Sequence, residues 1–133
     1  MSQCTKADAL GRQVSGNHYK GYRIQPVEFA MANRWDFCAS SALKYLLRHG
    51  DKNGRPDLEK ALHFIELREG LHSGWTAVEV ISMDDFIVAN CVAKAETTAL
   101  LALAQVVAIG TVRSYLELKA AIEHLITLRY GVE

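Results

Sequence analysis

Apolar residues recur at helical spacing over most of this 133-residue chain. From Asp36 to Gly50 they stand three and four positions apart, between an aspartate that can cap a helix and a glycine that can end one. After Pro56 the same spacing continues to Leu67. The pattern predicts two helices that form a hairpin, joined by the polar, basic loop 51–55.

Further helices are indicated on both sides of this hairpin. A short helix is expected over 25–33, with a proline at its first helical position. A long helix is expected over 82–109 and a last one over 111–129, each opened by a hydroxyl side chain that can cap it. Residues 74–81 mix β-branched residues with capping-box spacing, and we favour helix or turn there. Residues 1–15 show no period.

The segments predict one all-α domain over 1–133. We expect a flexible arm at 1–15, a half over 16–70 that carries the chemistry, and a packing half over 71–133. The fold is a helical hairpin plus two longer C-terminal helices, arranged like a bundle. Because the segment 100–109 is apolar on nearly every side, burial by several neighbours is needed to explain it. We therefore expect a homo-oligomer with this helix in its core.

A possible internal repeat accompanies the helical pattern. Three pairs of segments resemble one another: 27–33 and 84–90, 40–43 and 97–100, and 67–70 and 128–131. The first two pairs share one offset, at which Lys44, Tyr45 and Arg48 fall on Leu101, Ala102 and Gln105. A second copy would thus have exchanged charged side chains for packing. Short helical matches arise easily by chance, so the repeat is a hypothesis.

The charges balance over the whole chain and are unequal between its halves. Lysine plus arginine and aspartate plus glutamate each number 15, which disfavours a duplex nucleic acid or a membrane surface as partner. Up to Gly70 there are 11 basic and 8 acidic residues, and beyond it 4 and 7, so an anionic ligand favours the first half. The apolar stretch 97–109 is shorter than the roughly 20 residues that span a bilayer.

Cysteine usage indicates a reducing compartment. Cys4, Cys38 and Cys91 are odd in number, widely spaced and free of a CxxC motif, and no secretory signal precedes them. We expect reduced thiols and a cytoplasmic protein.

Cationic and aromatic residues gather around the predicted hairpin. Lys44 and Arg48 stand four apart on one helical face, where they can grip a phosphate or carboxylate. Further cations follow: Lys52, Arg55 and Lys60. Stacking faces and hydrogen bonds for a base or ribose can come from His18, Tyr19 and Tyr45. The alternative is that Lys44 and Arg48 form a solvated face, with Tyr45 in the core.

Other site chemistries find little support in the sequence. It contains no Walker loop, GxGxxG or GxSxG motif, and its histidines lack zinc-site spacing with the cysteines. We expect no metal site and no cofactor. If magnesium is used, the carboxylates near enough in sequence are Glu28, Asp51, Asp57 and Glu59.

An ordered set of blocks resembles a known family. The blocks are Asn17-His18-Tyr19, Ile24 to Phe29, Phe37 with Ala42 to Arg48, Lys52, and Asp57 to Ala61. Together they resemble small phage proteins of largely unknown function that include the T7-type phage nucleotide kinase. The resemblance covers about residues 16–70, and it departs at Ser40-Ser41, where the family carries Gly-Asn. It implies a helical protein that handles nucleotides through His18, Tyr19, Lys44, Tyr45, Arg48, Lys52, Asp57 and Lys60.

Three functions are therefore considered. The first is a phage-encoded protein in the host cytoplasm that binds a phosphate-bearing nucleotide or nucleotide-derived signal and sequesters it to counter host defence. The alternative is an enzyme, a nucleoside monophosphate kinase in which Asp57 or Asp51 places magnesium. The second alternative is a helical adaptor that binds a host protein through its apolar C-terminal helices. If Arg48 grips only the ligand, Arg48→Ala is expected to leave folding unchanged.

Overall fold

The computed structural model describes residues 4–12, 21–71 and 76–131, and within these ranges it contains helices and no strands. The helices are α1 (Lys6–Leu10), α2 (Pro26–Ala32), α3 (Phe37–Arg48), α4 (Arg55–Leu71), α5 (Met83–Ala89), α6 (Lys94–Ile109) and α7 (Val112–Tyr130). The predicted all-helical, bundle-like fold is confirmed.

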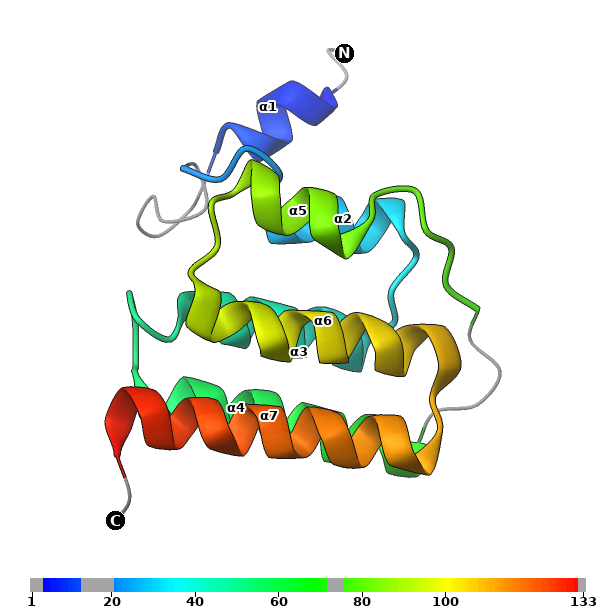
Figure 1. Cartoon of the computed structure of the whole chain (residues 1–133). Helices are drawn as coiled ribbons and strands as arrows, with labels where there is room; N and C mark the ends of the chain where they lie inside the picture. Colours follow the sequence, from blue (N-terminus) through cyan, green and yellow to red (C-terminus); the bar gives the residue numbers. More distant parts are fainter. Residues whose placement is uncertain (1–3, 13–20, 72–75, 132–133) are drawn as a thin grey trace.

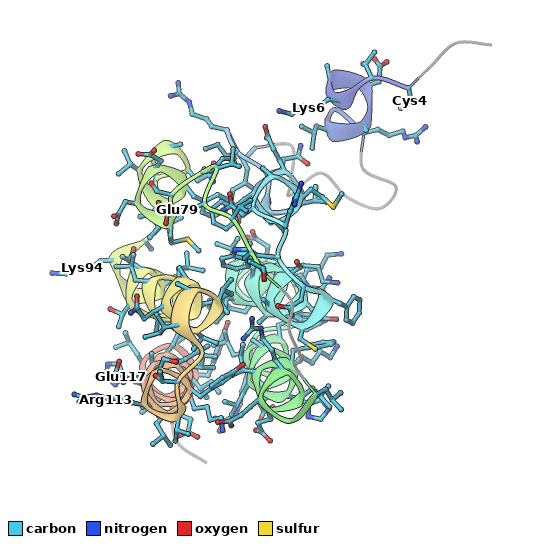
Figure 2. All side chains as sticks on the ribbon, turned by 90° about the vertical axis from the view of Figure 1, so that its right-hand side faces the viewer. Cys4, Lys6, Glu79, Lys94, Arg113 and Glu117 are labelled. Carbon is cyan, nitrogen blue, oxygen red and sulfur yellow. The ribbon has the colours of Figure 1, made fainter. Side chains whose placement is uncertain are left out.

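The helices lie in pairs across three levels. Figure 1 shows α2 beside α5, α3 beside α6, and α4 beside α7. Turned by 90°, the same helices form two columns, α2–α3–α4 and α5–α6–α7 (Figure 2). The short helix α1 lies at the α2–α5 end, where Lys6 Nζ pairs with Glu28 at 2.8 Å and Gln25 Nε2 donates to the Leu10 carbonyl. We predicted no regular element in this arm.

Capping side chains begin the helices where the sequence indicates. The Asp36 carboxylate accepts from the Ala39 N–H at 2.9 Å and opens α3. Ser82 and Thr111 accept from backbone N–H groups at 3.0 and 3.1 Å and open α5 and α7. The hairpin of α3 and α4 is also confirmed, since these two helices pack along each other.

The core runs through the centre of the three levels. Its largest fully buried side chains are Phe29, Phe86, Leu43, Leu46, Leu58, Ile65, Leu100, Leu103, Leu118, Ile122, Leu125 and Val106. At the α2–α5 level, Phe29 packs edge-on against Trp35, with ring centroids 5.0 Å apart, and against Phe86 at 4.9 Å. Both columns therefore contribute to one core.

The predicted long helix over 82–109 is wrong, because the chain turns after Ala89 and forms α5 and α6 separately. At the turn Cys91 adopts φ +51°, in the left-handed region. The Asn90 side chain accepts from the Ile24 N–H at 3.0 Å and donates to the Ile24 carbonyl at 2.8 Å. These long-range hydrogen bonds stabilise a break that local propensity does not reveal.

The segment before α5 also differs from prediction. Its described part, 76–81, is irregular rather than helical. The buried Asn33 side chain accepts from the Val80 and Ile81 N–H groups at 2.9 Å each and donates to the Ile81 carbonyl at 2.8 Å. Backbone groups that a helix would satisfy locally are thus satisfied by one distant side chain.

Burial of α6 is largely achieved inside this chain. Leu100, Leu103 and Val106 are fully buried, whereas Leu101 and Ile109 are exposed. The helix packs against α3, α5 and α7, so its apolar character no longer requires a second protein copy. None of the described helices combines the length and the apolar character needed to cross a lipid bilayer.

Candidate functional site

An aromatic row covers the outer side of the α3–α4 hairpin. The Tyr45 ring stacks on Phe64, with centroids 5.8 Å apart and planes 14° apart. The Phe37 ring also contacts Phe64, edge-on, with centroids 5.8 Å apart. Tyr45 and Phe64 are half-buried, while Phe37 is 76% exposed. The hairpin thus presents aromatic faces that its own side chains cover only in part.

Three cations surround the Tyr45 ring. Lys44 Nζ lies 4.6 Å from the ring centroid, Arg48 Cζ 4.7 Å and Lys60 Nζ 5.5 Å. Each distance is within the range of a cation–π interaction. The structure therefore brings together four of the residues that the sequence singled out. They are Tyr45 and the three cations around it, of which two come from consecutive turns of α3 and one from α4.

Arg48 has a second, structural contact. Its Nε donates to Asp57 Oδ2 at 3.2 Å, and the Asp57 side chain is fully buried in the first turn of α4. Asn53 supplies two more donors to the same carboxylate, its N–H at 3.3 Å and its Nδ2 at 3.4 Å. This carboxylate is thereby the point at which α3, the loop and α4 are joined.

The protonation of Asp57 follows from these contacts. Burial acts to raise the pKa of its carboxyl, but the hydrogen bonds from Arg48 and Asn53 outweigh burial, and the pKa lies below its ordinary value. Asp57 is therefore anionic at neutral pH and already held by three donors. Sequence reasoning treated it as a first-turn charge or a magnesium ligand, and its burial was not foreseen.

The remaining predicted site residues lie elsewhere. Lys52 is exposed in the loop after α3, where its N–H donates to the Arg48 carbonyl at 3.0 Å. His18 and Tyr19 lie outside the described residues.

A mostly apolar hollow of about 280 Å³ lies beside the cations. Its lining residues are Gln25, Pro26, Val27, Ala30, Phe37, Ser40, Ser41 and Lys44. Lys44 therefore belongs both to the hollow and to the group around Tyr45. Sequence reasoning did not select Pro26, Val27 or Phe37 for a site, although they stand within the blocks that carry the resemblance. Ser41, at the departure from the family pattern, also lines the hollow.

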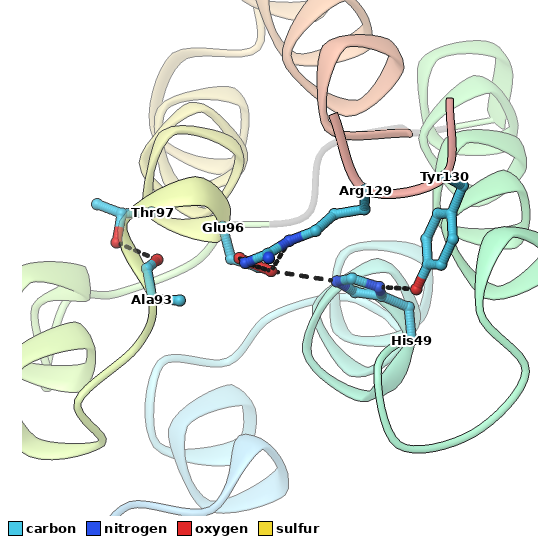
Figure 3. Close-up of polar contacts among 6 residues, drawn as sticks. All are labelled: His49, Ala93, Glu96, Thr97, Arg129 and Tyr130. Carbon is cyan, nitrogen blue, oxygen red and sulfur yellow. Dashed lines mark hydrogen bonds and ion pairs between the residues drawn. The ribbon is translucent and has the colours of Figure 1, made fainter. Parts of the chain in front are cut away.

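A polar cluster joins the two columns at the C-terminal end of α3 (Figure 3). His49 Nδ1 lies 2.5 Å from the Tyr130 hydroxyl, and its Nε2 lies 3.4 Å from Glu96 Oε1. Arg129 donates to both oxygens of Glu96, at 3.0 and 2.8 Å. The cluster was missed because its members come from the ends of three helices.

Burial sets the charge of His49. It lowers the pKa of the imidazole, against the opposing effect of the nearby Glu96 carboxylate. A neutral ring can donate from Nε2 towards Glu96 and accept the Tyr130 hydroxyl proton at Nδ1. Burial likewise raises the pKa of Tyr130, which keeps that hydroxyl protonated. The cluster is thus a fixed hydrogen-bond chain across the columns.

The end of α7 also braces the loop that carries Lys52. Arg55 donates to the Gly131 carbonyl at 2.9 Å, and Gly54 adopts φ +69° against the Tyr130 ring. A side chain at Gly54 is disfavoured by this backbone conformation. The loop geometry therefore depends on residues more than 70 positions away.

Comparison with known proteins gives one match. Residues 14–66 match the family described as a protein of unknown function (DUF3310), so this part of the chain carries a DUF3310 domain. It includes all of α2 and α3, the first two-thirds of α4, and each site residue chosen from the sequence. No curated protein and no solved structure matches the chain.

Proposed function

We propose that this protein binds a phosphate-bearing nucleotide, or a signal molecule derived from one, on the outer face of the α3–α4 hairpin. The observation that carries the proposal is the convergence of Lys44 and Lys60 on the Tyr45 ring beside an apolar hollow. Ammonium groups suit phosphate oxygens, and apolar and aromatic walls suit a base.

The two parts of such a ligand fit neighbouring parts of the face. The hollow of about 280 Å³ lies just below the usual size range of ligand sites, so it suits one ring system rather than a whole nucleotide. The exposed Phe37 ring at its edge offers a stacking surface. The phosphates then extend along Lys44 towards Lys60, and the Ser41 hydroxyl lies where it can bond the sugar or a phosphate.

Capture without turnover is the mode that the contacts favour. A kinase of the T7 phage type needs a carboxylate to place magnesium, but the Asp57 carboxylate is buried and held by Arg48 and Asn53. We propose that a phage uses the protein in the host cytoplasm to sequester its ligand and so blunt a host defence. Self-association through the C-terminal half stays a prediction.

The proposal is tested by ligand capture. The protein is incubated with a panel of nucleoside mono-, di- and triphosphates and cyclic nucleotides, washed, and heated to release what it holds, which is then analysed by mass spectrometry. We expect one ligand class to be retained and released unchanged. A ligand released with an added phosphate indicates the kinase alternative. Retention of nothing contradicts the proposal and favours the adaptor.

Variants locate the site. Lys44→Ala and Lys60→Ala should each weaken binding about 10- to 100-fold, the loss expected when a charge-assisted bond to phosphate is removed. The matched control is Lys94→Ala, because Lys94 is an exposed lysine at the start of α6 that points away from the hairpin (Figure 2). Equal affinity of all three variants would place the site elsewhere.

A further inference from the structure

The helices of the two columns begin at a constant spacing. The starts pair as Pro26 with Met83, Phe37 with Lys94, and Arg55 with Val112, each 57 positions apart. The first pair, α2 and α5, also ends at this offset, at Ala32 and Ala89. The repeated order of a short helix, a turn and two longer antiparallel helices is therefore in register at every helix start.

The turns after the short helices have the same backbone conformation. Asn33 has φ −90° and ψ 1°, and Asn90 has φ −97° and ψ 2°. Each is followed by a non-glycine residue in the left-handed region, Arg34 at φ +54° and Cys91 at φ +51°. Such residues are uncommon, so two at equivalent positions are unexpected in unrelated segments.

The two asparagines also make reciprocal contacts. The Asn33 side chain bonds both backbone groups of Ile81, and the Asn90 side chain bonds both backbone groups of Ile24. Ile24 and Ile81 are themselves 57 positions apart. Contacts in which i meets j′ and j meets i′ are the signature of a two-fold interface.

Buried positions correspond as well. At this offset the buried pairs are Phe29 and Phe86, Ala42 and Ala99, Leu43 and Leu100, Leu46 and Leu103, Leu58 and Tyr115, Ala61 and Leu118, and Ile65 and Ile122. Two clefts, of about 570 and 500 Å³, lie at equivalent places. One is lined by His49, Asn90 and Val92, and the other by Val106, Asn33 and Trp35.

We propose that the chain is a fused pseudo-dimer: residues 24–71 and 81–128 are two copies of one three-helix unit, packed about a pseudo-two-fold axis. The first copy lies largely within the DUF3310 domain, and the second is a diverged copy that supplies its packing partner within the same chain. The match of 67–70 with 128–131 has another offset and is not part of the repeat.

The second copy has lost the ligand face, a step that rests on the proposed function. The counterparts of Lys44, Tyr45, Arg48, Asp57 and Lys60 are Leu101, Ala102, Gln105, Ser114 and Glu117. The buried Ser114 hydroxyl donates to the Thr111 carbonyl at 2.7 Å, so no charged partner from α6 is needed. One chain therefore holds one ligand.

A double-mutant cycle tests the duplication without any ligand. If α6 and α7 repeat the geometry of α3 and α4, Gln105→Arg combined with Ser114→Asp recreates the Arg48–Asp57 pair. Ser114→Asp alone should lower the melting temperature by several degrees, because it buries an unpaired carboxylate. Gln105→Arg alone, at an exposed position, should change it little. The melting temperature of the double variant should lie several degrees above the value predicted by adding the two single changes.

The control places the arginine out of register. In the variant that combines Leu101→Arg with Ser114→Asp, the arginine stands at the counterpart of position 44 rather than 48. Its melting temperature should not recover. The duplication is overturned if the Gln105→Arg and Ser114→Asp changes are merely additive, if the double variant fails to fold, or if the control recovers equally.

A second arm separates this inference from the proposed function. Adding Leu101→Lys, Ala102→Tyr and Glu117→Lys to the coupled pair should raise the captured ligand from one to two per chain. A positive cycle with no ligand captured by either protein supports the duplication and contradicts the proposed function.

Discussion

Arg48, in the last turn of α3, donates its Nε hydrogen to Asp57, which is fully buried in the first turn of α4. The same guanidinium lies over the Tyr45 ring. Arg48 therefore holds the hairpin together at the place where a ligand is proposed to bind. The sequence-based expectation that Arg48→Ala leaves folding unchanged is revised on this ground.

Arg48→Ala should destabilise the protein by about 3 kcal/mol, the lower end for a buried ion pair that loses one partner, because Asp57 stays buried with its charge uncompensated. Urea unfolding followed by circular dichroism measures the change. Arg113→Ala is the control, since the Arg113–Glu117 pair is exposed on the outer side of α7 and should contribute almost nothing (Figure 2). An Arg48→Ala protein as stable as the control would show that the arginine has no structural role.

Acid should weaken the fold through Asp57. Because its pKa is lower in the folded state, its contribution is complete above the ordinary aspartate pKa of about 3.9 and is lost as the pH falls through the folded value. Asp57→Asn removes this dependence. Melting temperatures of the two proteins between pH 7 and pH 2 should converge at the acid end, and parallel curves would contradict the assignment.

His49 should titrate at lower pH than an exposed histidine. Burial lowers its pKa, so its stabilising contribution is present above the ordinary value of about 6.5 and is lost as the pH falls through the folded value. NMR titration of the His49 imidazole signals measures its pKa. Titration of His49 at or above the ordinary histidine pKa of about 6.5 would mean that the cluster with Tyr130 is open in solution.

The side-chain hydrogen bonds of Asn33 and of Asn90 should contribute similar amounts to the free energy of unfolding. Asn33→Ala and Asn90→Ala each leave backbone N–H and C=O groups of the other unit without a partner, which should cost about 2 to 4 kcal/mol. The exposed Gln105→Ala is the control. Chemical denaturation compares the three, and a change confined to one asparagine would argue against equivalent turns.

Local signals predicted the parts of the fold that local contacts determine. Asp36, Ser82 and Thr111 cap their helices as expected, because a cap bonds to backbone within three residues. The break after Ala89 was missed because its stabilising partner, Ile24, is 66 positions away. No periodicity can report such a contact.

In the candidate site, too, the features set by local contacts could be predicted from the sequence and those set by distant contacts could not. The spacing of Lys44 and Arg48 correctly predicts that they share a helical face beside Tyr45. Burial of Asp57 could not be read from its place in a first helical turn, where exposed acids are common. The hydrogen-bond chain of His49, Glu96 and Tyr130 joins residues up to 81 positions apart, so no pattern in the sequence indicates it.

The separation in sequence of the contacts also sets an order of assembly. The α3–α4 hairpin closes over a short loop, whereas the Asn33 and Asn90 bonds close loops of 48 and 66 residues. Closing a short loop costs less chain entropy, and local contacts generally form first. During synthesis, the cationic hairpin is therefore expected to form before its packing partner has left the ribosome, and the second unit then completes the core.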